Sequence, residues 1–212
     1  MSEIRKSTVF TIGHSTHSLQ RFIELLRQHR VTALCDVRSK PYSQINPQFN
    51  REKLEVALLA DGFIYRFLGR ELGARSEDRT CYKDGKVEYN RLAETALFKH
   101  GLKRVLRGIK EDFRIAIMCA EKEPLECHRT ILVARHLAQL GIYIEHIHAD
   151  GRLESHDAAL RRLAQIHSLP ELDMFRSPDD LIAEAYRRQE ERIAYEPTGP
   201  ATGGLAIKDP AE

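Results

Sequence analysis

The stretch from residue 114 to residue 148, RIAIMCAEKEPLECHRTILVARHLAQLGIYIEHIH, contains two apolar runs on either side of a helical pattern. The runs RIAIMC (114–119) and IYIEHIH (142–148) are short and rich in β-branched residues, which is typical of buried strands. Between them, CHRTILVARHLAQLG (127–141) has helical spacing and ends at Gly141, a residue that commonly follows a helix. Strand, helix and strand in this order indicate an α/β fold with a mostly parallel sheet.

The same alternation of strands and helices extends toward the N-terminus. Asn50 is predicted to cap one of the helices and Gly62 to end it. Residues 70–90 are polar and lack periodicity, so we interpret them as an insertion or lid. Apolar strands are predicted at residues 7–14, 31–39 and 63–69, and helices at 18–30, 51–61 and 91–106. We therefore expect a three-layer α/β fold in which helices cover both faces of the sheet.

The pattern changes after residue 150, where two further helices are predicted at residues 155–166 and 177–195. Ser177 is a good N-cap for the second, with Pro178 at the first helical position. We expect one domain, residues 1–194, made of a core (8–150) and a C-terminal helical extension (151–194). Residues 195–212 are rich in Gly and Pro, which predicts a disordered tail.

The composition excludes several classes of protein. The 212 residues are 42% hydrophobic and carry a net charge of +2, which suits a globular protein and does not by itself point to nucleic acid. No apolar run reaches the roughly 20 residues of a membrane span, and the N-terminus does not resemble a signal peptide. We expect a cytoplasmic protein without membrane association. Four cysteines are too sparse for a disulfide framework. Neither a cofactor nor an oligomeric state can be predicted.

Polar side chains follow several predicted strands at the point where each strand ends. Ligands of open parallel sheets bind outside the carboxyl ends of the strands, so this edge is the expected functional site. The residues concerned are His14 and Ser15, then Asp36, Arg38 and Ser39, then Cys119 and Glu121, and finally His146, His148 and Asp150.

The segment after Cys119 has an anion-binding interpretation. If a helix begins at Pro124, then Cys127, His128 and Arg129 lie in or near its first turn, where free N–H groups and the helix dipole favour an anion. Arg129 and Arg38 would then clamp a phosphate or carboxylate. In the alternative, Glu123 or Glu126 satisfies the helix start and Arg129 pairs with Asp36.

The cysteines suggest two further kinds of chemistry. Cys119, at a strand end before a helix, has the layout of the nucleophile in thiol phosphatases and rhodaneses, with Cys127 as a second candidate. The loop that follows is longer than the phosphate-binding loop of those enzymes and lacks its glycines, so an inert buried cysteine is the alternative. A metal site would combine Cys119, Cys127 and His128 with His14, His146 or His148. Because the spacing matches no common zinc pattern, we predict no metal.

Four motifs together resemble a known family. TIGHST (11–16), DVRSKPYSQINPQFN (36–50), FIYRFLGRELG (63–73) and CAEKEPLECHR (119–129) are similar to the signatures of the family called domain of unknown function 488. The resemblance covers about residues 8–150. It implies a compact α/β domain in the bacterial cytoplasm without an established reaction. The motifs include His14, Ser15, Asp36, Arg38, Ser39, Pro41, Ser43, Cys119, Glu121, Cys127, His128 and Arg129.

Our leading functional hypothesis is an enzyme that acts on a phosphate- or carboxylate-bearing substrate, such as a nucleotide. The assigned catalytic residues are Asp36 or His14 as general base and Cys119 or Cys127 as thiolate; the assigned anion-binding residues are Ser15, Arg38, Ser39, His128 and Arg129. One alternative is a nucleic-acid-binding module that uses Arg70, Arg75, Arg79 and Lys83, with Tyr42, Tyr65 and Tyr82 stacking on bases. Another is a non-catalytic scaffold.

Overall fold

The computed structural model of the protein describes residues 8–197. Most of the predicted disordered tail therefore lies outside the described residues. In the described part of the chain, no helix combines the length and the apolar character that a membrane crossing requires.

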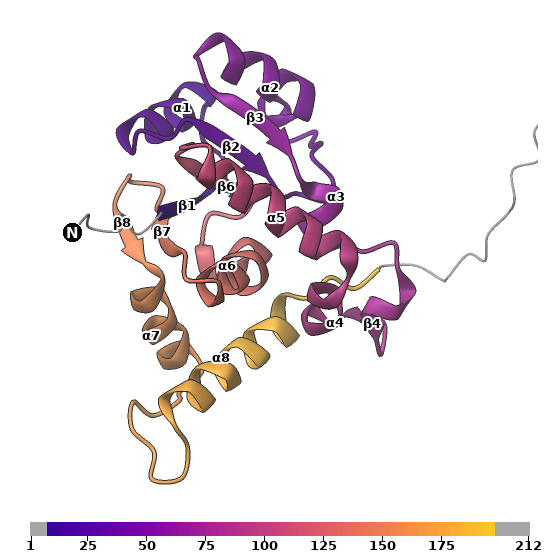
Figure 1. Ribbon diagram of the computed structural model, residues 1–212, viewed down its shortest axis with the longest axis vertical. Helices are drawn as coiled ribbons and strands as arrows, with labels where there is room; N and C mark the ends of the chain where they lie inside the picture. The colour runs from indigo at the N-terminus through magenta and orange to yellow at the C-terminus, as the bar shows by residue number, and fades with distance from the viewer. Residues whose placement is uncertain (1–7, 198–212) are drawn as a thin grey trace, which may run out of the picture.

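A six-stranded sheet with strand order β3-β2-β6-β1-β7-β8 forms the centre of the molecule (Figure 1). Five strands run parallel, and β8 pairs with β7 in the antiparallel direction at one edge. The strands are β1 (Thr8–Gly13), β2 (Ala33–Asp36), β3 (Ile64–Phe67), β6 (Ile115–Cys119), β7 (Tyr143–Ile147) and β8 (Leu153–Ser155). The mostly parallel α/β sheet predicted from the sequence is confirmed; the short edge strand β8 was not predicted.

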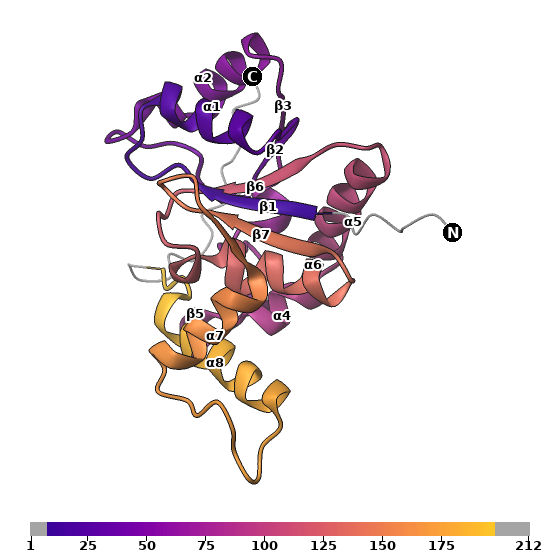
Figure 2. The same cartoon turned by 90° about the vertical axis from the view of Figure 1, so that its left-hand side faces the viewer.

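Helices cover both faces of this sheet, as Figure 2 shows. One face packs against α1 (Leu19–Gln28) and α2 (Arg51–Ala60), and the other against α5 (Ala96–Lys110) and α6 (Arg135–Gln139). Successive residues of a strand point to opposite faces, so Phe10 belongs to the first core and Val9 to the second. Burial on both sides explains why the strands read as continuous apolar runs.

The C-terminal extension is helical, as predicted. Its helices are α7 (His156–Ile166) and α8 (Pro178–Ile193). Ser177 caps α8 in a reciprocal capping box with Asp180. The Gln189 side chain of α8 is fully buried and donates a hydrogen bond to the Leu125 carbonyl at 2.7 Å. The extension is thereby fastened to the loop that leaves β6.

The predicted helix over residues 91–106 is two helices, α4 (Tyr89–Glu94) and α5. Thr95 separates them, because its backbone is extended and its hydroxyl accepts a hydrogen bond from Phe98 N. The predicted N-cap position of Asn50 is confirmed, but its side chain does not bond to the helix. Asn50 stands at the N-cap of α2, but its side-chain oxygen accepts a hydrogen bond from Ser43 N at 2.7 Å.

The predicted insertion contains short elements of its own. They are α3 (Gly69–Leu72), a 3-10 turn (Arg79–Cys81), β4 (Tyr82–Lys83) and β5 (Lys86–Val87). Val87 N donates a hydrogen bond to Tyr195 O at 3.0 Å, and Tyr89 N donates to the Glu190 carboxylate at 2.6 Å. The insertion and the end of α8 are therefore packed together.

The expected helix start at Pro124 is wrong. Pro124–Glu126 is a separate 3-10 turn, Cys127 is extended, and the next helix begins at Arg129 as a π-helical segment, Arg129–Ala134, that continues into α6. The Leu125 carbonyl is bonded to α8, as described above, and this tertiary contact takes the place of a helical hydrogen bond.

Candidate functional site

The carboxyl ends of β2, β6 and β1 lie next to one another at the centre of the sheet. Backbone hydrogen bonds continue past the strand ends, from His14 N to Cys119 O at 3.0 Å and from Val37 N to Met118 O at 3.0 Å. Because the strands are parallel, the residues that follow them emerge on the same side. The structure thus brings the residues that follow β1, β2 and β6 to one edge.

Asp36, Arg38 and His14 form a buried cluster at this edge. The Asp36 carboxylate accepts hydrogen bonds from Arg38 Nε at 2.9 Å and Nη2 at 2.6 Å, and from the Tyr65 hydroxyl at 2.8 Å. Arg38 Nη1 donates to His14 Nε2 at 3.2 Å, and the His14 ring stacks on Phe49. This planar, bidentate pair is a rigid geometry for a carboxylate and a guanidinium.

The same contacts occupy the lone pairs that a general base requires. Both oxygens of Asp36 are engaged, and His14 Nδ1 contacts Ser15 O at 2.9 Å while Nε2 faces Arg38. Burial, aided by the charge of Arg38, lowers the pKa of His14 to about 4, so the ring is neutral near pH 7. Asp36 and His14 therefore orient Arg38 in this structure, and proton transfer would require these bonds to break.

Arg129 is fully buried and does not face a cleft. Its guanidinium donates hydrogen bonds to the carbonyls of Glu121 at 2.7 Å and Lys122 at 3.3 Å. Gly13 makes room for this loop, because a Cβ there would lie 1.8 Å from Glu121 O. Arg129 thus fastens the loop after β6, and the predicted clamp of Arg38 and Arg129 on one anion is not formed.

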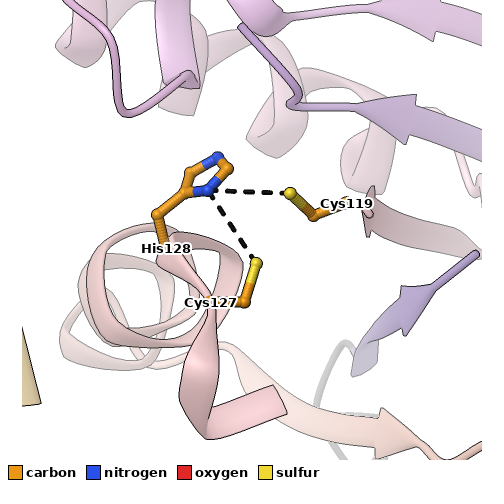
Figure 3. Close-up of side chains that lie close together, drawn as sticks. All are labelled: Cys119, Cys127 and His128. Atoms are coloured by element: carbon orange, nitrogen blue, oxygen red, sulfur yellow. Dashed lines mark hydrogen bonds between the residues drawn. The ribbon is translucent and has the colours of Figure 1, made fainter. Parts of the chain in front are cut away.

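Cys119, Cys127 and His128 meet beside this loop, although they lie on different local structures: a strand end, an extended residue and a helix cap. His128 Nδ1 lies 3.6 Å from Cys119 Sγ and 3.8 Å from Cys127 Sγ (Figure 3). Both cysteines are free and buried. His128 Nε2 lies 3.0 Å from the Val37 carbonyl, so this nitrogen carries the proton and Nδ1 presents its lone pair to the sulfurs.

Glu121 adds a carboxylate to this cluster. The Cys127 thiol donates a hydrogen bond to Glu121 Oε2 at 2.9 Å. Burial acts to raise the pKa of Cys127, but the hydrogen bond from Cys119 and the positive charge of Arg129 outweigh it and bring this pKa well below the ordinary value. Burial and the neighbouring Cys127 raise the pKa of Glu121. Glu121 is thus joined to the cluster by its hydrogen bond with Cys127.

Two adjoining hollows open at the carboxyl edge, and Arg38 and Lys40 line both. One, of about 210 Å³, contains the Cys119–Cys127–His128 cluster together with Ser39, Glu121 and Arg75. The other, of about 320 Å³, contains His14, Ser15 and Lys122. Lys40 and Lys122 were not predicted as site residues, although each lies only a few residues beyond a strand end.

The insertion and the C-terminal extension roof the smaller hollow. Its lining includes Tyr89 from the insertion and Tyr195 after α8, and the Arg75 guanidinium lies 4.5 Å from the centre of the Tyr195 ring. The Ser39 hydroxyl accepts a hydrogen bond from Arg75 N at 3.0 Å, so Ser39 holds the part of the insertion that covers the smaller hollow. Ser39, Arg75, Tyr89 and Tyr195 are far apart in the chain, and their spacing did not predict that they line the same hollow.

Two of the three tyrosines proposed to stack on nucleic-acid bases are engaged within the protein. Tyr65 is buried against Asp36, and the Tyr82 hydroxyl donates a hydrogen bond to Ser76 O at 2.7 Å. Tyr42 is exposed, with its hydroxyl bonded to Glu52. Of the three, Tyr65 is the one whose burial prevents stacking on a base.

The histidines of β7 do not join the site. His146 is buried and contacts Thr11 and His156, while His148 lies 2.9 Å from Glu154. His146 faces the layer of α7 and α8, because a residue inside a strand points to a face of the sheet and not to its edge.

Comparison with known proteins identifies the family of the chain. No curated protein and no solved structure matches the chain. The model of the family described as "Domain of unknown function DUF488" matches residues 18–136, which is more than half of the chain. This span contains β2, β3 and β6, the insertion, and the cluster of Cys119, Cys127 and His128. The chain belongs to the DUF488 family.

Proposed function

We propose that the protein is an enzyme that acts on a small substrate carrying a phosphate or carboxylate group, bound at the carboxyl edge of the sheet. The observation that carries this proposal is the meeting, in one cleft, of basic side chains with a thiol, an imidazole and a carboxylate. Convergent reactive groups in a concave site are the usual mark of an active site.

The basic side chains supply the attraction for an anion. Lys40 lies between the two hollows and Lys122 lines the larger one, and neither makes an ion pair within residues 8–197. Arg38 is held in place by Asp36 and His14 and has one N–H bond left for a ligand. A fixed donor and two mobile ammonium groups suit a phosphate or carboxylate.

The reactive groups lie on the floor of the smaller hollow. Cys127, His128 and Glu121 are held by the loop that Arg129 fastens, so their positions do not depend on substrate. The volume of about 210 Å³ is below the roughly 300–1,000 Å³ of most ligand pockets, so it would hold the reacting end of a larger molecule, such as a nucleotide. A cytoplasmic location is part of this proposal, since the expected substrates are metabolites.

Ligand-dependent melting tests the binding step. Inorganic phosphate, acetate and nucleoside monophosphates should raise the melting temperature of the wild type, with a stabilisation of about 2.7 kcal/mol at one hundred times Kd. Lys40→Met should reduce this effect strongly. Lys53→Met, which removes an exposed lysine on α2, is the matched control and should behave as the wild type.

Turnover tests the catalytic step. Glu121→Gln should keep the phosphate-dependent rise in melting temperature, because Glu121 is not one of the cations, and it should lose hydrolysis of p-nitrophenyl phosphate or p-nitrophenyl acetate. A wild type that is indifferent to every anion tried, or two lysine variants that lose binding equally, would contradict the proposal.

A further inference from the structure

We infer that Cys119, Cys127 and His128 bind a transition-metal ion, for which Zn²⁺ is the best match. The Sγ atoms of the two cysteines and Nδ1 of the histidine all lie within 4.8 Å of one another. Two thiolates and an imidazole form a soft donor set that favours zinc over the hard cations magnesium and calcium.

The distances between donors agree with tetrahedral coordination. With Zn–S of about 2.3 Å and Zn–N of about 2.0–2.1 Å, a tetrahedral angle places sulfur and nitrogen about 3.6 Å apart. The two sulfur–nitrogen distances in the structure are 3.6 and 3.8 Å. Figure 3 shows that both sulfurs and the ring nitrogen of His128 lie close together, so the three donor atoms can face one central ion.

The second ring nitrogen of His128 supports the same conclusion. Nε2 donates its proton to the Val37 carbonyl at 3.0 Å, so Nδ1 is unprotonated and available as a ligand. Metal-bound histidines almost always donate their other N–H to a carbonyl or carboxylate, which fixes the ring and its tautomer. Val37 follows β2, so the sheet itself orients the ligand.

The loop between the ligands is built to hold them together. Arg129 bonds the carbonyls of Glu121 and Lys122, and the absence of a side chain at Gly13 lets this loop approach β1. Arg129 N also donates a hydrogen bond to Cys127 Sγ at 3.4 Å. Buried thiols in such surroundings become metal ligands on loss of their protons, which couples metal binding to proton release.

Three protein ligands leave one coordination position for water or substrate, which is the arrangement of catalytic zinc sites. The cluster lines the smaller hollow, and the Glu121 carboxylate lies beside Cys127. A metal ion here would supply a Lewis acid for the anionic group of the substrate. This catalytic part rests on the proposed function, whereas metal binding does not require it.

The inference reverses the sequence-based prediction that no metal is bound. Cys119 and Cys127 are separated by a loop, in contrast to the short cysteine pairs that open common zinc sites. The loop brings them together only after its tertiary contacts form.

Metal uptake by the reduced, full-length protein tests the site. After chelator treatment and gel filtration, the wild type should take up one equivalent of Zn²⁺. Co²⁺ in its place should give thiolate-to-cobalt charge-transfer absorption and the intense visible bands of four-coordinate geometry. Cys119→Ser, Cys127→Ser and His128→Gln should each weaken Zn²⁺ binding by more than the roughly 10–100-fold that outer-shell changes cost.

Cys35→Ala is the matched control, because Cys35 is also a buried free cysteine but lies outside the cluster; it should keep full affinity. Circular dichroism and melting curves establish that each variant is folded, and Glu121→Gln provides a variant that leaves all three ligands in place. A reduced wild type without Zn²⁺ uptake, or uptake that ignores all three ligand substitutions, overturns the inference. Zn²⁺ binding without any response to phosphate would instead overturn the proposed function alone.

Discussion

Acidification should destabilise the fold through His156, the first residue of α7. His156 Nδ1 lies 3.1 Å from His146 Nε2 on β7, and its Nε2 lies 2.9 Å from the Tyr186 hydroxyl on α8. His146 Nδ1 in turn lies 2.7 Å from the Thr11 hydroxyl. Both rings are buried and bonded to neutral groups, so an added proton would place a charge without a partner in the core.

The pKa of His156 sets the magnitude. Burial lowers it to about 4, against the small opposing effect of Asp157, while the unfolded chain titrates near its ordinary value of about 6.5. Between these values the unfolded state binds a proton that the folded state excludes, so the free energy of unfolding falls as the pH falls. At about 1.36 kcal/mol per pKa unit, the limit is about 3.4 kcal/mol, of which about 2 kcal/mol is lost between pH 7 and pH 5.

Urea unfolding at pH 7, 6 and 5, followed by circular dichroism, measures this loss. His156→Gln should have a free energy of unfolding that falls by about 2 kcal/mol less than that of the wild type between pH 7 and pH 5. His100→Gln, at an exposed position of α5, should keep the wild-type pH dependence. The lowered pKa of His146 contributes in the same direction, so some dependence should persist. Equal losses for His156→Gln and the wild type would refute the reasoning.

Three substitutions near the site should act on stability in different ways. Asp36→Asn should cost about 3–5 kcal/mol in urea unfolding, because it leaves the buried Arg38 without its counter-ion; a loss below about 1 kcal/mol would show that the pair is solvated. Arg129→Met should cost about 3 kcal/mol, since it removes the buried guanidinium that donates to the carbonyls of Glu121 and Lys122, and it should lower the melting temperature even without ligands; a stable variant that merely fails to bind phosphate would restore the anion-clamp interpretation. Gly13→Ala should displace the following loop, because its Cβ would lie 1.8 Å from Glu121 O, and should weaken Zn²⁺ affinity measured by chelator competition; unchanged affinity would separate the loop position from the metal site.

The sequence by itself determined the main strands of the sheet and the edge at which the candidate site residues gather. The apolar runs that became β1, β2 and β6 are recognisable because burial on both faces demands continuous apolar residues. His14, Arg38 and Cys119 could be assigned to one edge because parallel strands all end on the same side. Helix starts governed by local bonds, such as the one at Ser177, were equally predictable.

Only the tertiary structure decided what these residues contact. The sequence allowed Asp36 to pair with Arg129. In the structure, Asp36 pairs with Arg38. Arg129 instead donates hydrogen bonds to the carbonyls of Glu121 and Lys122, because the loop after β6 passes beside it. That path depends on a long-range bond from Gln189 on α8, which no local pattern encodes. Cys119, Cys127 and His128 meet beside the same loop. Spacing along a chain reports proximity only within regular elements, and the site is made of the irregular segments between them.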